Sequence, residues 1–453
     1  MSRIEIGRAS VVVSDPDERL LESLRAFNRE DGGQGQYENL YTIGSDGKTI
    51  ATLPGFANRV RKLTRQPRII DKRIPMPNPD FESAMNGMHE YCAECVIRML
   101  KSGGGIVSVP EVIGCEAIAA SIMRAFPRSS LLDRGTPLSV VITSNRDEAF
   151  RIARALRRLM PNRDVGVATP GSYTDSEDVI VSTYGALCDI PCNAVGVLLS
   201  DGLPDYRVDN CASSVSAIRN AARWAVCESP LGGPVDVSIM HEGLFGPLVA
   251  TTTYSDAVKA GAAAPITVCW LSSPKPNSPS GSAPFKMLEA IAMQSNPRFC
   301  GLVADIIRNT NPETGAVMVT KLRAMAVGVM KLLPGVAKIT RLSSGAERRS
   351  VLEGLATGDI RKAIICDGDF KLASSCRVMV VASCEGGGSI RRIPWMESKC
   401  GERSYIVDFS HEWDVHNGRP GMLAMNDMAR ERRYTELGFC QVRCGGVNEL
   451  PFA

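Results

Sequence analysis

The chain has 453 residues, about three times the length of a typical domain, which predicts two or three domains and excludes a single small module. Hydrophobic residues make up 44% and charged residues 22%, a balance typical of soluble globular proteins and unlike that of disordered chains. The formal net charge of +3 is too small to indicate a nucleic-acid or membrane surface over the whole molecule.

Residues 1–78 are expected to form an N-terminal extension. They contain a short β-like run at 10–13, an amphipathic helix pattern at 17–27 and a basic stretch at 59–73. The basic stretch has no interleaved aromatic residues, so we interpret it as a solvated face or a contact for an acidic partner protein. Phosphate binding is the alternative interpretation.

From residue 79 the chain alternates short apolar runs with longer helical patterns. Strands are predicted at 105–109, 138–143, 179–183 and 195–199, and helices at 117–126 and 146–159. This alternation indicates a parallel sheet covered by helices, so a first α/β domain is predicted over 79–273.

The segment 274–284 (PKPNSPSGSAP) is rich in Pro, Ser and Gly, and we predict that it links two domains. The alternation then resumes, with strands at 317–320, 337–341, 363–366, 378–382 and 405–409 and helices at 322–333 and 346–356. A second α/β domain with a C-terminal tail is therefore predicted over 285–453.

The order of these segments resembles that of superfamily 2 helicases, which have two RecA-like lobes. The resemblance covers about residues 85–445. In the first lobe, 103–110 resembles motif I, 138–145 resembles motif Ia, and 178–184 resembles the segment that contacts the nucleic-acid strand. The segments 195–201 and 248–253 lie where motifs II and III belong. In the second lobe, 315–320, 341–358 and 362–367 resemble motifs IV through V in that order, and 391–395 lies at motif VI. The resemblance implies two tandem RecA-like parallel-sheet domains.

The residues that carry the chemistry of this family are largely replaced. Motif I needs a Lys for the phosphates and a Ser or Thr for Mg²⁺, whereas Gly114 is followed here by Cys115 and Glu116. Motif II keeps Asp201 without its Glu, and motif VI keeps Arg392 without the following finger arginine. The resemblance therefore implies a vestigial nucleotide site, with no catalytic residue and no cofactor.

A nucleic-acid contact is implied at Ser182, Thr183 and Tyr184, because hydroxyl groups can donate to a phosphate backbone without ATP. The alternative is a strand end packed into its turn. A divergent active ATPase, in which the catalytic residues are displaced, is a further alternative.

Two groups of residues have spacings that suggest a metal site. Cys92 and Cys95 lie on a predicted helix without a second Cys or His pair, so we expect core thiols rather than a zinc site. The second group is His411, His416, Asp408 and Asp414, which we interpret as an exposed polar loop. We therefore predict no metal, and the absence of a G-x-S-x-G elbow argues against a hydrolase.

Fifteen scattered cysteines, an odd count, and an N-terminus without an apolar signal indicate folding in a reducing compartment. No run approaches the roughly 18 apolar residues of a membrane-spanning helix. The closing segment 433–439 resembles the last helix of viral helicase-like proteins of the iridovirus and poxvirus type.

These resemblances imply a catalytically inactive helicase-like protein that serves as a structural or assembly component, a minor virion protein of a large DNA virus. Its expected partners are capsid or core proteins, with nucleic acid as a further candidate, and its expected location is the virion after synthesis in the host cytoplasm. The main alternative is an ATP-independent nucleic-acid-binding accessory factor in viral transcription or packaging.

Overall fold

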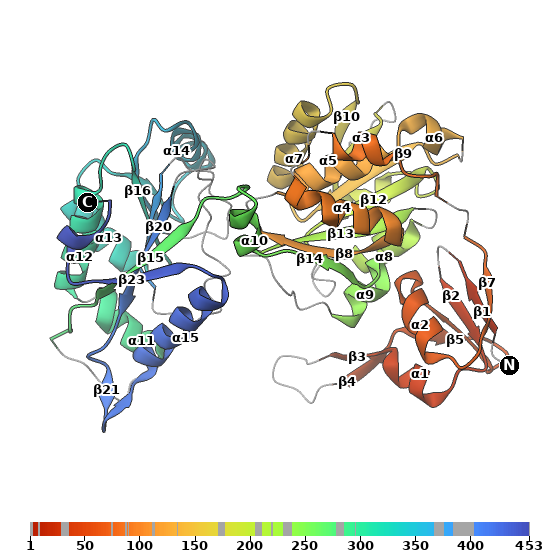
Figure 1. The fold of residues 1–453 in the computed structure, drawn as a ribbon, viewed down its shortest axis with the longest axis horizontal. Coiled ribbons are helices and arrows are strands. Elements are labelled where there is room, and N and C mark those ends of the chain that lie inside the picture. The colour runs from red at the N-terminus through yellow and green to blue at the C-terminus, as the bar shows by residue number, and fades with distance from the viewer. Residues whose placement is uncertain are drawn as a thin grey trace. The chain divides into compact units, whose positions relative to one another are not determined.

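The structure is a computed structural model in which the chain forms two compact units, Met1–Thr252 and Thr253–Ala453. Figure 1 shows the first unit from red to green and the second from green to blue. The residues that the structure describes are 3–7, 10–28, 36–73, 76–86, 88, 90–110, 114–133, 135–170, 177–203, 211–218, 221–229, 238–277, 285–294, 296–366, 376–383 and 403–452. Each unit has its own hydrophobic core.

The first unit begins with a five-stranded mixed sheet in the order β5-β6-β2-β1-β7. Its strands are β1 (Arg3–Ile6), β2 (Val11–Ser14), β5 (Tyr41–Ile43), β6 (Thr49–Thr52) and β7 (Arg68–Asp71). Alternating apolar residues of β1 and β2 share one core with α1 (Glu18–Ser23) and α2 (Ala57–Leu63). The predicted helix over 17–27 ends earlier, at Ser23, because β3 (Arg25–Asn28) pairs with β4 (Gln36–Asn39) as a hairpin.

The larger sheet of the first unit has seven parallel strands in the order β10-β11-β9-β12-β13-β8-β14. They are β8 (Gly104–Pro110), β9 (Leu138–Thr143), β10 (Val165–Ala168), β11 (Val179–Thr183), β12 (Val195–Asp201), β13 (Ala222–Ser229) and β14 (Leu248–Thr251). The four strands predicted for this part are confirmed as β8, β9, β11 and β12. The sequence did not predict β13, which lies between β12 and β8.

Helices pack against this sheet through apolar faces. The main ones are α4 (Glu90–Ser102), α5 (Cys115–Ala125), α7 (Arg146–Leu159) and α9 (Ile239–Phe245). Helix α7 begins where the Asn145 side chain accepts a hydrogen bond from the Glu148 amide at 2.9 Å. It buries Ala149, Ile152 and Leu156, spaced as one helical face.

The second unit also has seven parallel strands, in the order β17-β18-β16-β19-β20-β15-β23. They are β15 (Ile266–Ser272), β16 (Ala316–Thr320), β17 (Ala337–Ile339), β18 (Lys362–Cys366), β19 (Val378–Val381), β20 (Ser404–Ser410) and β23 (Cys440–Cys444). Its helices include α10 (Tyr254–Lys259), α12 (Pro297–Asn309), α13 (Arg323–Leu332), α14 (Gly345–Thr357) and α15 (Met422–Glu436). The five predicted strands and two predicted helices of this domain are all present.

The division of the chain differs from the predicted boundary at 274–284. Strand β15 precedes that segment and yet lies between β20 and β23 in the second sheet. The structure therefore divides the chain after Thr252. A buried apolar strand such as β15 pairs equally well with either sheet as far as its own sequence goes, so its partner is a matter of tertiary structure.

Helix length also bears on membrane insertion. No helix within the described ranges is long and apolar enough to span a bilayer.

Candidate functional site

The carboxyl ends of β8, β9 and β12 lie at one edge of the first unit's parallel sheet, where α/β proteins commonly bind ligands. The register sets Pro110 of β8 beside Ser229 of β13, and Asp201 of β12 beside Val226 of β13. The first-lobe residues of the predicted nucleotide site therefore follow strands that end at the same edge.

Cys115 does not face this edge as the phosphate-binding lysine would. Helix α5 begins at Cys115 after Gly114, whose φ of 73° is in the left-handed region that favours glycine. The Cys115 side chain is fully buried among the apolar residues that cover the sheet. The residue at the lysine position is thus part of the core.

Glu116 occupies the position where the helicases that the sequence resembles have a Ser or Thr, and its largely buried carboxylate forms an ion pair with a partly exposed cation. Its partner is the Arg151 guanidinium on α7, which also donates to Glu148 at 2.7 Å. The Glu116 side chain is only 12% exposed and lies in the first turn of α5, where the helix dipole favours negative charge. A protein carboxylate therefore sits at the helix N-terminus, where a phosphate binds in nucleotide-binding relatives of this fold.

Asp201 lies at the end of β12 and remains partly exposed. One of its carboxylate oxygens accepts a hydrogen bond from the Thr143 hydroxyl at 3.0 Å. Gly202 follows with φ of 84°, in the left-handed region that favours glycine. This carboxylate is therefore held at the edge by a side chain from the neighbouring strand β9.

The predicted nucleic-acid contacts fall into two groups. Ser182 is fully buried and its hydroxyl donates to the Thr183 carbonyl at 2.9 Å. Tyr184 is 5% exposed, and its hydroxyl lies 2.8 Å from that of buried Ser200 on β12. These two side chains are packed into the strand end, and only Thr183 of the three is partly exposed.

Arg392 and the rest of the segment that resembles motif VI lie outside the described residues, whereas Lys362–Cys366, in the segment that resembles motif V, form β18. The structure brings Gly114, Cys115, Glu116 and Asp201 to the first sheet, and the contribution of Arg392 stays a prediction.

The group at 408–416 is not the exposed polar loop that the sequence predicted, because Asp408, His411 and Asp414 are buried. His411 is buried beside Asp427, whereas His416 lies 3.0 Å from Asp414. Burial raises the pKa of the thiols of Cys92 and Cys95 on α4, to about 12 and about 11. Within the described ranges, no cluster of three or more His, Cys, Asp or Glu side chains could hold a metal ion.

Arg151 is the residue of this site that the sequence did not identify. It lies 35 positions after Glu116 along the chain, on a helix that contains several other arginines, so no local pattern distinguishes it. The one available signal is that a carboxylate in a buried first turn needs a cationic partner.

Solved structures of Dbp5 support the fold of this chain. A variant of Dbp5 from S. cerevisiae, bound to Gle1 and IP6, superposes with a TM-score of 0.53 at 10% identity over 82% of this chain and 94% of that one. Dbp5 bound to RNA and ADP BeF3 gives 0.50 at 10% identity, covering 80% and 96%. T4 UvsW gives 0.43 at 15% identity, covering 98% and 99%.

No family model matches the sequence. A stretch of 108 residues is 31% identical to a 4-alpha-glucanotransferase of Mycobacterium tuberculosis, but the match spans 24% of this chain and 14% of that enzyme. A match this short is no evidence for a shared activity. The sheet order, the parallel strands and the solved structures agree instead on two tandem RecA-like α/β domains that follow a mixed N-terminal sheet.

Proposed function

We propose that this chain is a catalytically inactive helicase-like protein that works as a structural or assembly component. The observation that carries the proposal is the ion pair between Glu116 and Arg151 at the N-terminus of α5. A phosphate entering there would be repelled by the negative charge of the Glu116 carboxylate. The nearby cation, Arg151, is already paired with that carboxylate. The buried Cys115 offers no charge to offset this.

Loss of nucleotide binding removes the driving force of a helicase cycle, because the closing and opening of such enzymes depend on the bound nucleotide. What remains is a protein with a large surface for contacts with other proteins. The proposed setting is a minor virion protein of a large DNA virus, with capsid or core proteins as partners. This part rests on the resemblance of segment 433–439 to viral helicase-like proteins.

Nucleotide turnover tests the first half of the proposal. ATP hydrolysis by the full-length chain is measured with Mg²⁺, with and without nucleic acid, beside Asp201→Ala prepared in the same way. We expect the two proteins to hydrolyse ATP at the same background rate. Turnover by the wild-type chain that Asp201→Ala abolishes would overturn the proposal and establish a divergent ATPase.

Particle composition tests the second half. Quantitative mass spectrometry of purified virions, treated with nuclease to remove external nucleic acid, should find this chain at a fixed ratio to the major capsid protein. Its absence from such particles would refute the structural role, even if the chain proves inactive.

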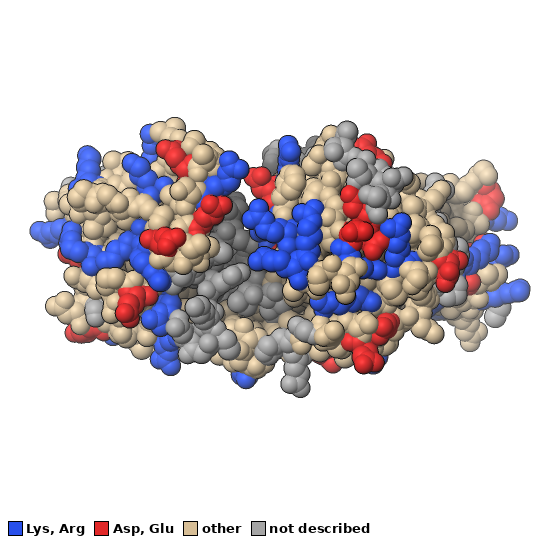
Figure 2. All heavy atoms as spheres, turned by 90° about the horizontal axis from the view of Figure 1, so that it is seen from above, with Lys and Arg blue, Asp and Glu red and all other residues tan. Residues whose placement is uncertain are grey.

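A nucleic-acid-binding accessory factor is the second candidate, and exposed arginines favour it. Arg146, Arg154 and Arg158 of α7 are exposed, and Figure 2 shows Lys and Arg side chains gathered over the part of the first unit where α7 lies. Binding of labelled single-stranded and double-stranded DNA across a salt series tests it. A steep loss of affinity with salt that Arg154→Ala and Arg158→Ala both reduce would support this role.

A further inference from the structure

A cavity of about 580 Å³ lies in the first unit at the amino-terminal edge of the large sheet. Its floor includes Gly104 at the start of β8 and Arg223 near the start of β13. The Glu116–Arg151 pair belongs to the opposite, carboxyl edge. The cavity is therefore separate from the vestigial nucleotide site.

The N-terminal sheet domain and the large sheet supply opposite walls of the cavity, and close contacts hold these walls together. Arg59 of α2 donates to the carboxylate of Glu242 on α9, with 3.1 Å between Nε and Oε1. Gly55 packs directly on α9, since a Cβ atom there would lie 2.7 Å from the Gly243 carbonyl oxygen. The cavity is therefore formed where two parts of the first unit pack against each other.

Arg223 is the buried charge of this cavity. It is 5% exposed, and its guanidinium donates to the Ile218 carbonyl at 2.6 Å and reaches the Leu244 carbonyl at 3.5 Å. Its Nε is buried without a hydrogen-bond partner, and no carboxylate pairs with it among the described residues. Burial lowers the pKa of Arg223 to about 10. A buried guanidinium without a counter-ion is costly, and a bound anion would remove that cost.

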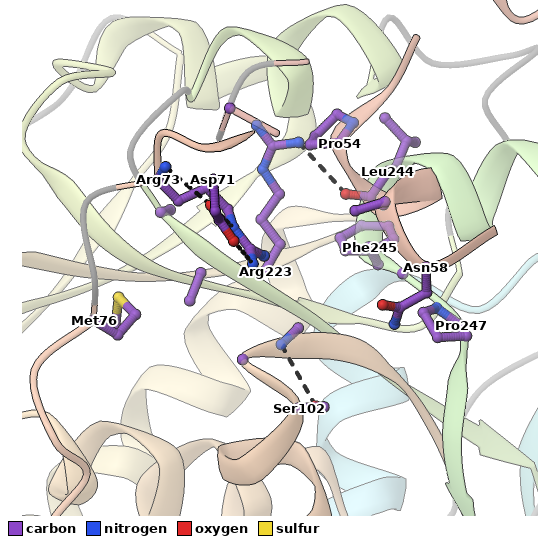
Figure 3. Close-up of a pocket in the computed structure, with 18 of the residues that line it drawn as sticks. Pro54, Asn58, Asp71, Arg73, Met76, Ser102, Arg223, Leu244, Phe245 and Pro247 are labelled. Atoms are coloured by element: carbon purple, nitrogen blue, oxygen red, sulfur yellow. Dashed lines mark hydrogen bonds and ion pairs between the residues drawn. The ribbon is translucent and has the colours of Figure 1, made fainter. Parts of the chain in front are cut away.

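The lining of the cavity carries more positive than negative charge. Arg61, Arg73 and Lys101 also line the cavity, against one acidic lining residue, Asp71. Figure 3 shows Arg73 joined to Asp71, and the Arg223 side chain pointing toward the backbone of Leu244. Asp71 is bound by Arg73 at 2.9 Å and lies 3.4 Å from Arg61, so four cations against one anion leave three positive charges uncompensated in the lining.

We propose that this cavity binds a small phosphorylated molecule, with its phosphate group held by Arg223, Arg61 and Lys101. The planar guanidinium fork matches phosphate and carboxylate geometry alike, but the excess of positive charge favours a doubly charged phosphate over a single carboxylate. The apolar wall formed by Pro54, Phe245 and Pro247 would cover the organic part of the ligand. A cavity of this volume is in the range of small-molecule sites.

Calorimetric titration of the full-length chain tests this, with inorganic pyrophosphate, AMP and acetate as probes. We expect saturable binding of pyrophosphate and AMP, and weaker binding of the singly charged acetate. Equal affinity for pyrophosphate and AMP would assign recognition to the phosphate alone, while tighter AMP binding would add contacts from the apolar wall. Absence of saturable binding of either phosphate probe below about 10 mM would overturn the proposal.

Variants locate the binding. Arg61→Ala and Lys101→Ala should each weaken the Kd for pyrophosphate about tenfold, because each removes a charged hydrogen-bond donor. The matched control is Lys62→Ala, which changes an exposed lysine on the same helix α2 that does not line the cavity. An equal effect of Lys62→Ala and Lys101→Ala would show non-specific attraction and refute the site. Arg223→Met should abolish binding, and the Arg61 and Lys101 variants decide the question if that protein does not fold.

Discussion

The buried arginine of the second unit offers a sharp test of how this fold is held together. Arg430 on α15 is 1% exposed and donates to both oxygens of Asp408 on β20, at 3.0 and 3.1 Å. It also donates to Asp427 at 2.9 Å, and the hydroxyl of buried Tyr434 donates to Asp408 at 3.0 Å. Burial by itself lowers the pKa of Arg430, but the charges of Asp408 and Asp427 outweigh it and raise that pKa above its ordinary value.

Arg430→Met would leave two buried carboxylates without their cation. Removing one partner of a buried ion pair costs about 3–5 kcal/mol, because the remaining charge stays out of water. The matched control is Arg433→Met on the same helix, where the ion pair with Glu436 is largely exposed and is worth about 0.2–1 kcal/mol. We therefore expect a several-fold larger loss of unfolding free energy at Arg430.

Urea unfolding followed by circular dichroism measures both variants, with the transition of the second unit identified by hydrogen exchange of peptides from β20 and α15. The double variant Asp408→Asn, Arg430→Met should lose less unfolding free energy than the sum of the two single variants, because Asp408→Asn removes one of the buried carboxylates that Arg430→Met leaves without a cation. A loss below about 1 kcal/mol in Arg430→Met, or one equal to that of Arg433→Met, would refute the reasoning.

Three further predictions concern thiols, a helix cap and the core. The Cys92 thiol should react with iodoacetamide at pH 8 more than 100-fold more slowly than the exposed Cys188 thiol, because its raised pKa of about 12 leaves little thiolate. The reaction rate of Cys92 should rise with pH, and peptide-resolved mass spectrometry measures both rates. Asn145→Ala should destabilise the first unit by about 1 kcal/mol through loss of the α7 cap, as chemical denaturation will show. Phe299→Ala should cost the second unit about 3–5 kcal/mol by opening a cavity beside Phe409.

Each of these has an outcome that would contradict it. Equal labelling of Cys92 and Cys188 in the native protein would mean that α4 is not packed as described. The cap argument fails if Asn145→Asp, which keeps the acceptor oxygen, loses as much stability as Asn145→Ala. For the core, Phe299→Leu serves as the control and should lose clearly less than Phe299→Ala.

Much of the secondary structure could be read from local pattern. The runs at 138–143 (LSVVIT) and 179–183 (VIVST) are mostly apolar without a strict alternation, as expected for strands covered on both faces, and both form largely buried parallel strands. Strand β13 escaped prediction because its apolar run is interrupted by Arg223 close to its start. That same arginine lies at the cavity that only the packing of the N-terminal sheet creates.

The sequence by itself determined the alternation of strands and helices, and with it two successive α/β domains, because the period of buried residues is a local property of the chain. The replacement of phosphate-binding residues by Cys115 and Glu116 is also visible there. Only the tertiary structure decided that β15 joins the second sheet, that Glu116 pairs with Arg151, and that Ser182 and Tyr184 are buried. Such pairings depend on which distant segments meet in space, and no local pattern of residues carries that information.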